Sequence, residues 1–455
     1  MLLWLVVPPH AGRGPEVYIE VRGVHERLPV GALRPTLASR RPWAAARAVP
    51  AAREPARAPR PHRARRARRH RTRRARARGH TLPRMSGDRQ ASYRAAGVDY
   101  DALDAAKRMA MAKALATSPL LRQREGRARD DSRGEPAFVF ELDGRAYAFV
   151  VEGLGTKSII ARQVLERHGV NRFADVAYDA VAAIVNDLAC VGALPLVANA
   201  YFATGASDWY RDSERANALL EGWRRACADA GCAWGGGESP SLPGLVAELD
   251  IELAGAAVGV VPRGRAPILG AELAAGDEIV LVASSGLHAN GASLARAVAG
   301  GLPGGYATAL PSGATLGEAL LAPSICYVPL IAALLQSGAP LTYVSHITGH
   351  GLLKLMRAPA PLSYRVQRLP EVPEVLSLLV AEARLDAHAA YSTFNMGAGL
   401  AVYCRAGGAE QIISAARARG LPALLAGRVE PGPRQVQLEP VGVRFGGEEL
   451  ELSAD

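Results

Sequence analysis

The stretch AFVFELDGRAYAFVVEGLGTK, residues 137–157, contains the pattern that decides the fold. Apolar, strand-forming residues flank Asp143-Gly144, and this dipeptide favours a two-residue hairpin turn. Residues 137–151 are therefore predicted to form two antiparallel strands around that turn. A glycine-rich loop, Glu152 to Lys157, follows the second strand directly. Such a loop at a strand end can bring backbone amides and side chains onto a ligand.

Predicted strands and helices alternate on both sides of this hairpin. Tyr100 to Ala116 has the composition of a helix, and a linker with Gly and Pro begins at Pro262. Alternation in two comparable halves predicts an α/β protein with mixed, α+β-like sheets and two α/β domains, residues 85–262 and 263–455. Further helices are predicted at residues 173–190, 213–231, 291–299, 327–336 and from 351, and further strands at 196–204, 249–261, 278–283, 343–347, 399–404, 427–430 and 435–438.

Residues 1–84 differ in composition from the rest of the chain. They contain 21 arginines, no lysine and four acidic residues, and the arginines are densest from Arg63 to Arg78. A nucleic-acid-binding arm has such charge, whereas a targeting peptide would need a basic n-region or more serine. The composition turns globular at Met85. We therefore expect residues 1–84 to be a disordered, Arg-rich extension or not to be translated at all.

The composition of residues 85–455 excludes several classes of partner. These residues have 33 basic and 39 acidic side chains, a mildly acidic balance that predicts no nucleic-acid binding by the folded body. No apolar run reaches 18 residues, so no membrane-spanning helix is expected. The five cysteines lie far apart, without the spacing of a zinc site, and are typical of reduced thiols in a cytoplasmic protein.

Two glycine-rich clusters in the first half of the chain are candidate ligand loops. In Glu152 to Lys157 the glycines would allow close approach of a phosphate, Lys157 would supply charge and Glu152 could hold a cation. The alternative is a purely structural turn. Residues 235–238, three glycines followed by Glu238, could thread a metal-bound triphosphate or merely turn the chain.

Asn186 and Asp187 form a polar pair inside a predicted helix that is otherwise apolar. Burying an unpaired carboxylate costs several kcal/mol, on the order given for unpaired ions, unless it is paired or binds a metal. The pair is therefore predicted to bind a ligand or metal. The alternative is that both residues cap a neighbouring helix.

Three further clusters lie at strand–helix junctions of the second half. Ser284 to Gly291 sits between a strand and a helix, so free amides at the helix start could bind an anion that His288 or Asn290 contacts. A single histidine can equally be an ordinary surface or core residue. Residues 346–351 form another glycine turn of this kind, and residues 393–399 follow later.

The order and spacing of these clusters resemble the aminoimidazole ribonucleotide synthetase family, also called phosphoribosylformylglycinamidine cyclo-ligases. The resemblance spans about residues 92–435 and is more specific for this family than for the related hydrogenase-maturation, selenophosphate, thiamine-phosphate and formylglycinamidine synthetase proteins. The matching motifs are Ser92–Asp99, Gly153–Lys157, Val185–Leu188 with Gly192-Ala193 and Pro195-Leu196, Tyr201–Gly205, Gly236–Glu238, Ser284–His288 with Asn290-Gly291, Leu321–Pro323, His346–Gly349 and Thr393–Asn395.

The resemblance implies a homodimer with two α/β domains per subunit, in which the N-terminal domains form a shared barrel. It also implies an enzyme of purine biosynthesis that converts a small ribonucleotide, formylglycinamidine ribonucleotide, with ATP and Mg²⁺ into aminoimidazole ribonucleotide, ADP and phosphate. ATP would phosphorylate the formyl amide oxygen, and the amidine nitrogen would displace the phosphate as the ring closes. The alternatives are a divergent paralogue that phosphorylates another amide or acid, and a catalytically silent ATP-binding dimeric module.

The family's site residues are carried over by motif position. Asp187 and His288 are expected to be catalytic, and Glu152, Asp187 and Glu238 to hold the metal. The expected ATP and phosphate contacts are Gly153, Gly155, Thr156, Lys157, Asn186, Gly236 and Gly237, and the expected substrate contacts are Ser285, Asn290, Thr348 and Asn395.

The sequence departs from the family pattern at three places. Glu152 stands where the family has Asp, and His350 interrupts a turn of three glycines. The glycine-rich flap is absent, and Arg124 to Pro136 occupies its position. Residues 118–135 are polar and Arg-rich and are predicted to form a loop. The part from Arg124 to Pro136 is predicted to be mobile and to order over bound phosphates as a lid.

Overall fold

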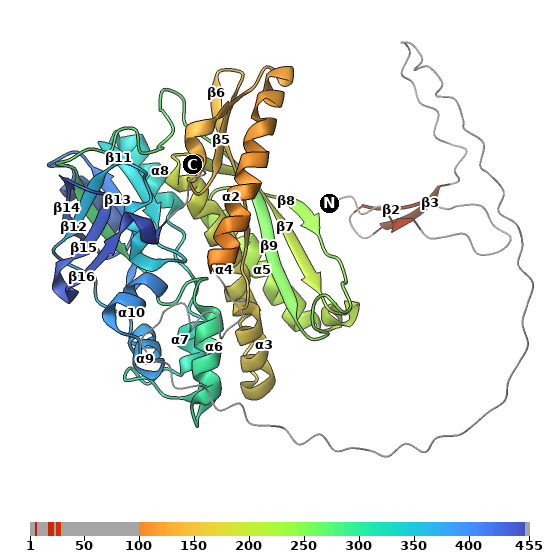
Figure 1. Ribbon diagram of the computed structural model, residues 1–455. Coiled ribbons are helices and arrows are strands. Elements are labelled where there is room, and N and C mark those ends of the chain that lie inside the picture. The colour runs from red at the N-terminus through yellow and green to blue at the C-terminus, as the bar shows by residue number, and fades with distance from the viewer. Residues whose placement is uncertain (1–4, 7–16, 22–23, 29–99, 451–455) are drawn as a thin grey trace, which may run out of the picture. The chain divides into compact units, whose positions relative to one another are not determined.

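The computed structural model describes residues 5–6, 17–21, 24–28 and 100–450 (Figure 1). The chain divides into two compact units, Met1–Arg78 and Gly79–Asp455. In the first unit, β1 (Leu5–Val6), β2 (Val17–Val21) and β3 (Val24–Leu28) pair as an antiparallel sheet. The rest of residues 1–84 and the Ser92–Asp99 motif lie outside the described residues. The expected disordered extension therefore stays a prediction.

A six-stranded mixed sheet occupies the first half of the second unit. Asp143 and Gly144 have φ values of 50° and 68°, as a two-residue type I′ turn requires, which confirms the predicted hairpin. Only β7 and β8 run parallel in this sheet. The strand order is β4-β5-β6-β9-β7-β8, with β4 (Arg127–Arg129), β5 (Phe138–Leu142), β6 (Arg145–Gly153), β7 (Leu194–Thr204), β8 (Ala233–Glu238) and β9 (Ile251–Val260).

Helix α4 (Phe173–Cys190) covers one face of this sheet, where it contacts β6, β7 and β9. Its bounds match the predicted helix, because buried apolar residues recur at helical spacing along it. Helix α5 (Ser213–Asp229) packs beside it and begins at Asp212, whose carboxylate accepts the amide of Arg215. The remaining helices of this half are α2 (Tyr100–Thr117), which was predicted, and α3 (Lys157–His168), which was not.

A seven-stranded mixed sheet forms the second half of the unit. Its strand order is β11-β13-β10-β14-β12-β15-β16, and only β12 and β15 run parallel. The predicted mixed α/β architecture is thus confirmed. The strands are β10 (Glu278–Ala283), β11 (Leu341–His346), β12 (Leu362–Val366), β13 (Ala398–Cys404), β14 (Ala423–Pro431), β15 (Gln435–Leu438) and β16 (Val443–Gly446).

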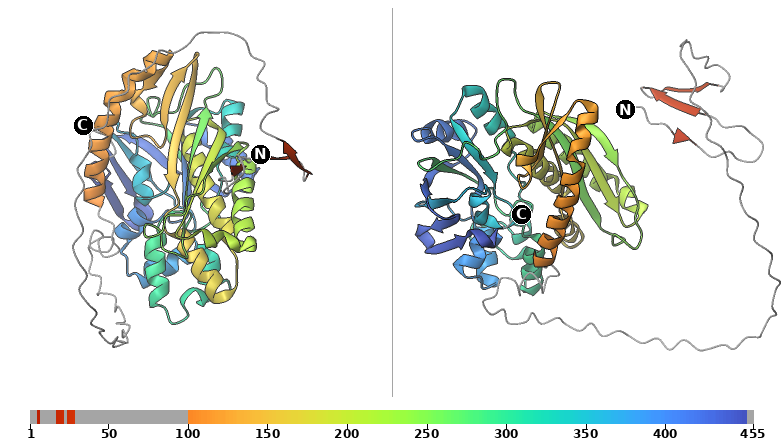
Figure 2. Two further views of the ribbon diagram at one scale, coloured as in Figure 1. Left: turned by 90° about the vertical axis from the view of Figure 1, so that its right-hand side faces the viewer. Right: turned by 45° about the horizontal axis from the view of Figure 1, so that its top comes forward.

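Six helices accompany the second sheet in the described part of the chain, and the helix predicted from residue 351 is the 3₁₀ segment η6 (Gly351–Met356). Helix α8 packs on both α4 and α11, and α4 also contacts β11, so α4 lies between the two sheets (Figure 2). The helices are α6 (Ala292–Gly301), α7 (Leu316–Leu320), α8 (Val328–Ser337), α9 (Glu374–Glu382), α10 (Ala387–Thr393) and α11 (Ala409–Arg417).

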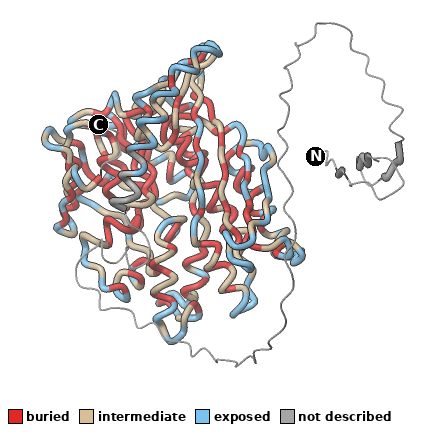
Figure 3. Tube along the Cα trace, turned by 45° about the vertical axis from the view of Figure 1, so that its right-hand side comes forward, coloured by how far each residue is buried: buried red, intermediate tan, exposed pale blue. Residues whose placement is uncertain are grey.

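One contiguous hydrophobic core runs through both halves, and Figure 3 shows buried segments in both sheets and in the helices between them. Pro262 lies in the connection between β9 and β10, which belong to different sheets. We propose a domain boundary there. No helix within the described ranges has both the length and the apolar character needed to cross a membrane.

The prediction of a loop over residues 118–135 is wrong. The segment contains the 3₁₀ turns η2 (Ser118–Arg124) and η3 (Asp130–Ser132), and β4 between them pairs with β5. Arg127 and Arg129 lie 2.8 and 3.4 Å from the carboxylate of Glu141 on that neighbouring strand. The arginines therefore satisfy a cross-strand acid, which the polar composition alone did not indicate.

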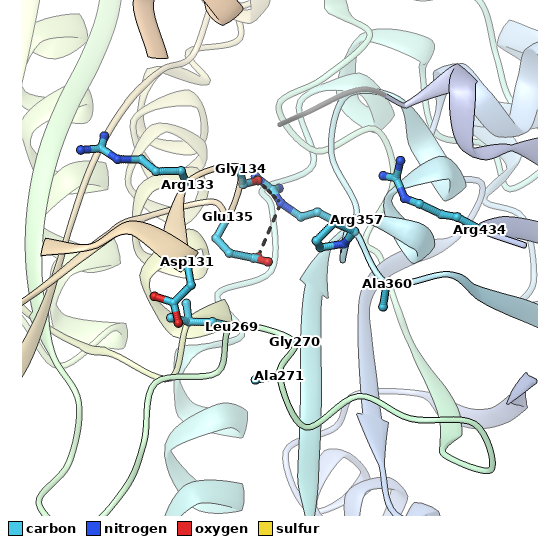
Figure 4. A pocket seen from close by; sticks show the side chains of 11 residues that line it. Asp131, Arg133, Gly134, Glu135, Leu269, Gly270, Ala271, Arg357, Ala360 and Arg434 are labelled. Atoms are coloured by element: carbon cyan, nitrogen blue, oxygen red, sulfur yellow. Dashed lines mark hydrogen bonds and ion pairs between the residues drawn. The ribbon is translucent and has the colours of Figure 1, made fainter. Parts of the chain in front are cut away.

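The end of this segment crosses to the second sheet, beside a cavity of about 500 Å³ (Figure 4). Tyr343 on β11 donates its hydroxyl to Glu135 at 2.8 Å, and Arg357 donates two hydrogen bonds to the Gly134 carbonyl at 3.0 and 2.9 Å. Burial raises the pKa of the Glu135 carboxyl above its usual value. In this structure the segment is a bridge between the sheets and not the expected loop.

Candidate active site

Several of the predicted ligand loops meet where strands of the two sheets end. The Oγ1 atom of Thr156, in the loop after β6, lies 3.0 Å from Oγ of Ser293 in the first turn of α6. Asn290, in the loop after β10, lies beside the loop after β11, since its Oδ1 is 3.4 Å from where a Cβ on Gly349 would stand. The folding of both sheets against α4 therefore brings together loops that are far apart in the sequence.

Lys157 anchors this arrangement from the first residue of α3. Its side chain is fully buried, and Nζ lies 2.5 Å from Oδ2 of Asp179 on α4. Nζ also donates to the carbonyls of His288 at 2.8 Å and Ala322 at 3.4 Å. The ammonium group therefore donates to two backbone carbonyls, and its charge is paired with the Asp179 carboxylate. The predicted contact of Lys157 with phosphate stays a prediction.

One polar face of α4 holds a segment of the second half. Asp179 Oδ1 accepts the amide of Ser324 at 2.6 Å. Asn186 accepts the amide of Tyr327 at 2.7 Å and donates to the Ile325 carbonyl at 2.9 Å. Sequence analysis missed Asp179, although it lies seven residues before Asn186 in an apolar helix and so on the same face. That spacing was the available signal.

Asp187, the next residue of α4, forms a buried hydrogen bond with His346 at the end of β11. Its Oδ1 lies 2.8 Å from Nδ1 of His346, and both side chains are at most 13% exposed. The ring of Tyr327 lies 6.3 Å from the ring of His346 and 6.3 Å from that of His288, measured between ring centroids. The two predicted catalytic residues, Asp187 and His288, thus lie in one cluster around Tyr327.

His288 is buried in a left-handed backbone conformation with φ of 59°. Its Nε2 accepts the amide of Ser285 at 3.1 Å, so in the neutral ring the hydrogen lies on Nδ1. Burial lowers the pKa of His288 well below its usual value, and the nearby charges of His346 and Lys157 lower it further. Nδ1 is buried and has no hydrogen-bond partner among the described residues. The site therefore contains a neutral imidazole with one unsatisfied donor.

Asn395 fixes the loop that carries His288. Its Oδ1 accepts the hydroxyl of Ser284 and the amide of Gly397, each at 2.9 Å, and its Nδ2 donates to the Gly286 carbonyl at 2.8 Å. Ser285 donates its hydroxyl to the Pro323 carbonyl at 2.6 Å. In this structure both predicted substrate residues hold neighbouring backbone. Their contact with substrate, like that of Asn290 and Thr348, stays a prediction.

The glycines before Glu238 have a structural role in β8. A Cβ on Gly237 would stand 2.1 Å from the Ala200 carbonyl oxygen of β7, and a Cβ on Gly235 would stand 2.4 Å from Oδ1 of Asn199. At Gly237 the close atom is backbone, so the position excludes larger residues, whereas at Gly235 the neighbouring Asn199 side chain would have to move. The glycines lie within strand β8 and let it approach β7, so they do not merely turn the chain as the alternative stated. A role of Gly236 and Gly237 in binding nucleotide stays a prediction.

The three predicted metal ligands do not lie together in the folded structure. Glu152 pairs with Gly255 of β9, whereas Glu238 lies on β8, three strands from β6. At the usual strand spacing this separates the two by about 14 Å. Asp187 is bonded to His346 instead. Among residues 100–450 no group of three His, Cys, Asp or Glu side chains could hold a metal ion. The three predicted ligands therefore do not form a preformed metal centre within the described part of the chain.

An acid that the sequence analysis did not select lies under the glycine loop after β6. Oε1 of Glu252, on β9, is 3.3 Å from where a Cβ on Gly153 would stand, and the carboxylate accepts the amide of Gly155. Burial raises the pKa of Glu252, and the hydrogen bond from Gly155 partly offsets this. A single acid in an otherwise apolar strand was the signal in the sequence.

Comparisons with known proteins identify the family to which the chain is similar. The model of the AIR synthase related protein N-terminal domain matches residues 134–261, and that of the corresponding C-terminal domain matches residues 274–438. The phosphoribosylformylglycinamidine cyclo-ligase of Anaeromyxobacter sp. (strain Fw109-5) is 38% identical over 313 residues, which cover 67% of this chain and 87% of the relative.

Two further relatives with the same name match over more of the chain. That of Sorangium cellulosum (strain So ce56) is 38% identical over 347 residues, 74% of this chain and 95% of the relative. That of Carboxydothermus hydrogenoformans is 32% identical over 355 residues, 76% of this chain and 98% of the relative.

Two mixed sheets that meet across α4 define an α/β protein, and the buried polar cluster at the ends of their strands is its candidate active site. The relatives confirm the predicted enzyme class, an ATP-dependent cyclo-ligase that forms a carbon–nitrogen bond. The chain belongs to the AIR synthase related protein family.

Proposed function

We propose that this enzyme uses ATP to cyclise formylglycinamidine ribonucleotide to aminoimidazole ribonucleotide, with release of ADP and phosphate, in purine biosynthesis. The formyl amide oxygen attacks the γ-phosphorus of ATP, and the bond to the β,γ-bridging oxygen breaks to release ADP. The amidine nitrogen then attacks the activated carbon. The carbon–oxygen bond breaks, phosphate leaves and the nitrogen loses a proton as the ring closes.

The observation that carries this proposal is the unsatisfied donor of His288. A buried N–H without a partner costs free energy on the order of 1–3 kcal/mol, which a bound oxygen atom would recover. We assign Nδ1–H of His288 to an oxygen of the substrate amide or of the transferred phosphoryl group. A neutral imidazole suits this role because it donates a hydrogen bond without adding charge to a buried site.

The other residues of the cluster position the loops. Asp179 and Asn186 hold residues 324–327 against α4, and Asn395 holds the loop after β10. Anchored loops support catalysis because they keep reacting groups oriented and exclude water from an activated intermediate that water would destroy. Thr156 and the amides of the preceding glycine loop are the proposed contacts of the ATP phosphates.

Magnesium would enter with the nucleotide. Mg²⁺ keeps several waters and is commonly held by one or two carboxylates together with substrate phosphates. That requirement is met without a preformed cluster, so Glu152 and Asp187 are the proposed protein ligands. Glu238, about 14 Å from Glu152 at the usual strand spacing, would serve a site shared with a second subunit.

A homodimer through the open face of the first sheet is part of the proposal. The sheet face opposite α4 carries apolar side chains that are 36–62% exposed, namely Phe149, Val151, Val197 and Tyr201. A row of exposed apolar side chains on a sheet is typical of a protein interface.

All five cysteines are free, which supports a reducing, cytoplasmic location.

The test is to incubate the purified full chain with formylglycinamidine ribonucleotide, ATP and Mg²⁺ and to measure ADP and aminoimidazole ribonucleotide. We expect one ADP for each ring-closed product and no ADP without the acceptor. His288→Asn should lower kcat, because Asn cannot reproduce the imidazole N–H donor. Asn tolerates the left-handed backbone conformation at this position, so the loop should keep its shape. The matched control is His168→Asn at an exposed histidine, with unchanged kcat. ADP release without ring closure would overturn the proposed reaction.

A further inference from the structure

The C-terminus of α5 has a Schellman cap in which both contacting positions are cysteine. The amide of Gly231, with φ of 67°, donates to the carbonyl of Ala228 at 3.0 Å. The amide of Cys232 donates to the carbonyl of Cys227 at 2.9 Å. These two bonds define the motif, in which the side chains of its first and last residues commonly touch. Here those residues are Cys227 and Cys232.

The cap holds the two cysteines within disulfide range. The path from Cα to O in Cys227, across the 2.9 Å hydrogen bond, and from N to Cα in Cys232 places the two Cα atoms at most about 6.8 Å apart. Disulfides require Cα separations of about 4.4–6.8 Å. The two thiols also lie close enough for each to shift the pKa of the other. No large backbone movement is therefore needed to join them.

The two sulfur atoms differ in reactivity. The hydrogen bond from Cys227 lowers the pKa of Cys232 and raises that of Cys227. Cys227 is buried, whereas Cys232 is partly exposed. An attacking thiolate at Cys232 and a resolving thiol at Cys227 follow from this asymmetry. Cys326 lies close enough to raise the pKa of Cys227, but burial raises its own pKa to about 12 and keeps it a thiol.

We infer that Cys227 and Cys232 form a reversible oxidation site that a hydroperoxide converts to an intrachain disulfide. With hydrogen peroxide, the Cys232 thiolate attacks one oxygen, the O–O bond breaks and Cys232 becomes a sulfenic acid. The departing hydroxide takes the proton that the Cys232 thiol released and leaves as the first water. The Cys227 sulfur then attacks that sulfur and the S–O bond breaks. The Cys227 proton goes to the departing hydroxide, which leaves as the second water. Two thiols are oxidised and one peroxide is reduced.

The site lies next to a predicted nucleotide segment, since β8 with Gly236, Gly237 and Glu238 begins one residue after Cys232. Because the cap already holds the two Cα atoms within disulfide range, the disulfide should leave β8 in place. It should also protect Cys232 from irreversible oxidation to the sulfinic acid. The expected consequence is protection of the enzyme during peroxide exposure and not loss of turnover.

Mass spectrometry tests this on the full chain, because trypsin should release residues 226–263 as one peptide containing Cys227 and Cys232 and no other cysteine. The protein is treated with hydrogen peroxide, quenched with catalase, denatured, alkylated with iodoacetamide and digested. We expect this peptide to resist alkylation and to weigh two hydrogen atoms less than its reduced form, while the other three cysteines are alkylated. Dithiothreitol should restore both alkylations.

Variants separate the two roles. Cys227→Ser should leave Cys232 as a sulfenic acid that dimedone traps, and prolonged peroxide should convert it to the sulfinic acid. Cys232→Ser should leave Cys227 fully alkylatable, and the control Cys326→Ser should form the disulfide as the unmodified chain does. Full alkylation of both cysteines after peroxide treatment, or a disulfide that includes Cys326, would overturn the inference.

Discussion

Oδ1 of Asp187, on the helix between the sheets, lies 2.8 Å from Nδ1 of His346 at the end of β11. The bond orients a nearly buried carboxylate toward the loops that carry the predicted ligand contacts. A carboxylate at such a position costs free energy unless a partner compensates it. His346 supplies that partner in this structure, and magnesium with nucleotide would supply a second one in the proposed reaction.

Asp187→Asn is expected to lower kcat by about 100-fold or more, on the scale of losing one positioned electrostatic group, while the protein stays folded. Asn has nearly the same size and can still hydrogen-bond to His346, but it lacks the charge that a magnesium ion requires. Steady-state rates and thermal midpoints measure the two effects. Asp208→Asn, at an acid with a 71% exposed side chain, is the control. Normal kcat in folded Asp187→Asn would sink the metal assignment.

Lys157→Met is expected to destabilise the protein by about 3–5 kcal/mol, because it leaves Asp179 as an uncompensated buried charge. Urea unfolding gives this difference. The double variant Lys157→Met with Asp179→Asn should recover part of the loss, since Asn can still accept the Ser324 amide and carries no charge. A double variant no more stable than the single one would show that the ion pair is not the cause.

Stability should also depend on pH through His288. Its pKa is lowered in the folded protein, so below the unfolded value of about 6.5 the unfolded chain binds an extra proton. The neutral ring contributes fully to the free energy of unfolding above that pH. This contribution is lost as the pH falls toward the folded pKa, by at most about 1.4 kcal/mol per pH unit. Urea unfolding from pH 7.5 to 5 should show a shallower decline in His288→Asn. His168→Asn should decline as the unmodified chain does, and equal slopes in all three would contradict the prediction.

Local patterns predicted the elements that local interactions define. The Asp143-Gly144 turn and the bounds of α4 follow from residues near one another in the chain, and both were predicted correctly. The loop predicted at residues 118–135 failed because the partners of Arg127 and Glu135 lie on other strands. Polar composition cannot reveal a cross-strand acid or a tyrosine more than 200 residues away.

The site residues that could be predicted differ from those that could not in the same way. Motif positions selected His288, Asp187 and Asn395, which the fold does bring into one region. They could not show that Lys157 is paired with Asp179, or that β8 and β6 are three strands apart, because strand order is a property of the whole sheet. Glu252 was missed for the same reason, since only the pairing of β9 with β6 sets it under the glycine loop.

Gly399→Ala is expected to destabilise the site by about 1–3 kcal/mol, as overpacking of a tight interior does. A Cβ there would stand 1.8 Å from Oη of Tyr327 and 3.0 Å from Cε1 of His288. Thermal and urea unfolding, together with kcat, measure the effect. Gly300→Ala is the control, because a Cβ at that position in α6 meets nothing within 4 Å and alanine favours helix. Equal stabilities of the two variants would show that the ring of Tyr327 gives way freely.

Val151→Glu is expected to convert the proposed dimer to a monomer and to abolish most of the turnover. Val151 is 62% exposed on the open face of the first sheet, where Phe149 and Tyr201 are exposed as well. A carboxylate in the middle of an apolar interface would lose its water without gaining a partner, which strongly disfavours association. Sedimentation and light scattering measure the mass, and the ring-closure assay measures turnover.

The control for this surface is Leu120→Glu, at a 56% exposed leucine of η2, which is not one of the strands that form the face. It should leave mass and turnover unchanged, because it adds the same charge outside the proposed contact. A monomeric Val151→Glu with full turnover would separate dimerisation from catalysis and would remove Glu238 from the proposed shared site. A Val151→Glu protein that still has the mass of a dimer would place the interface elsewhere, since one buried carboxylate per subunit could not be tolerated on this face.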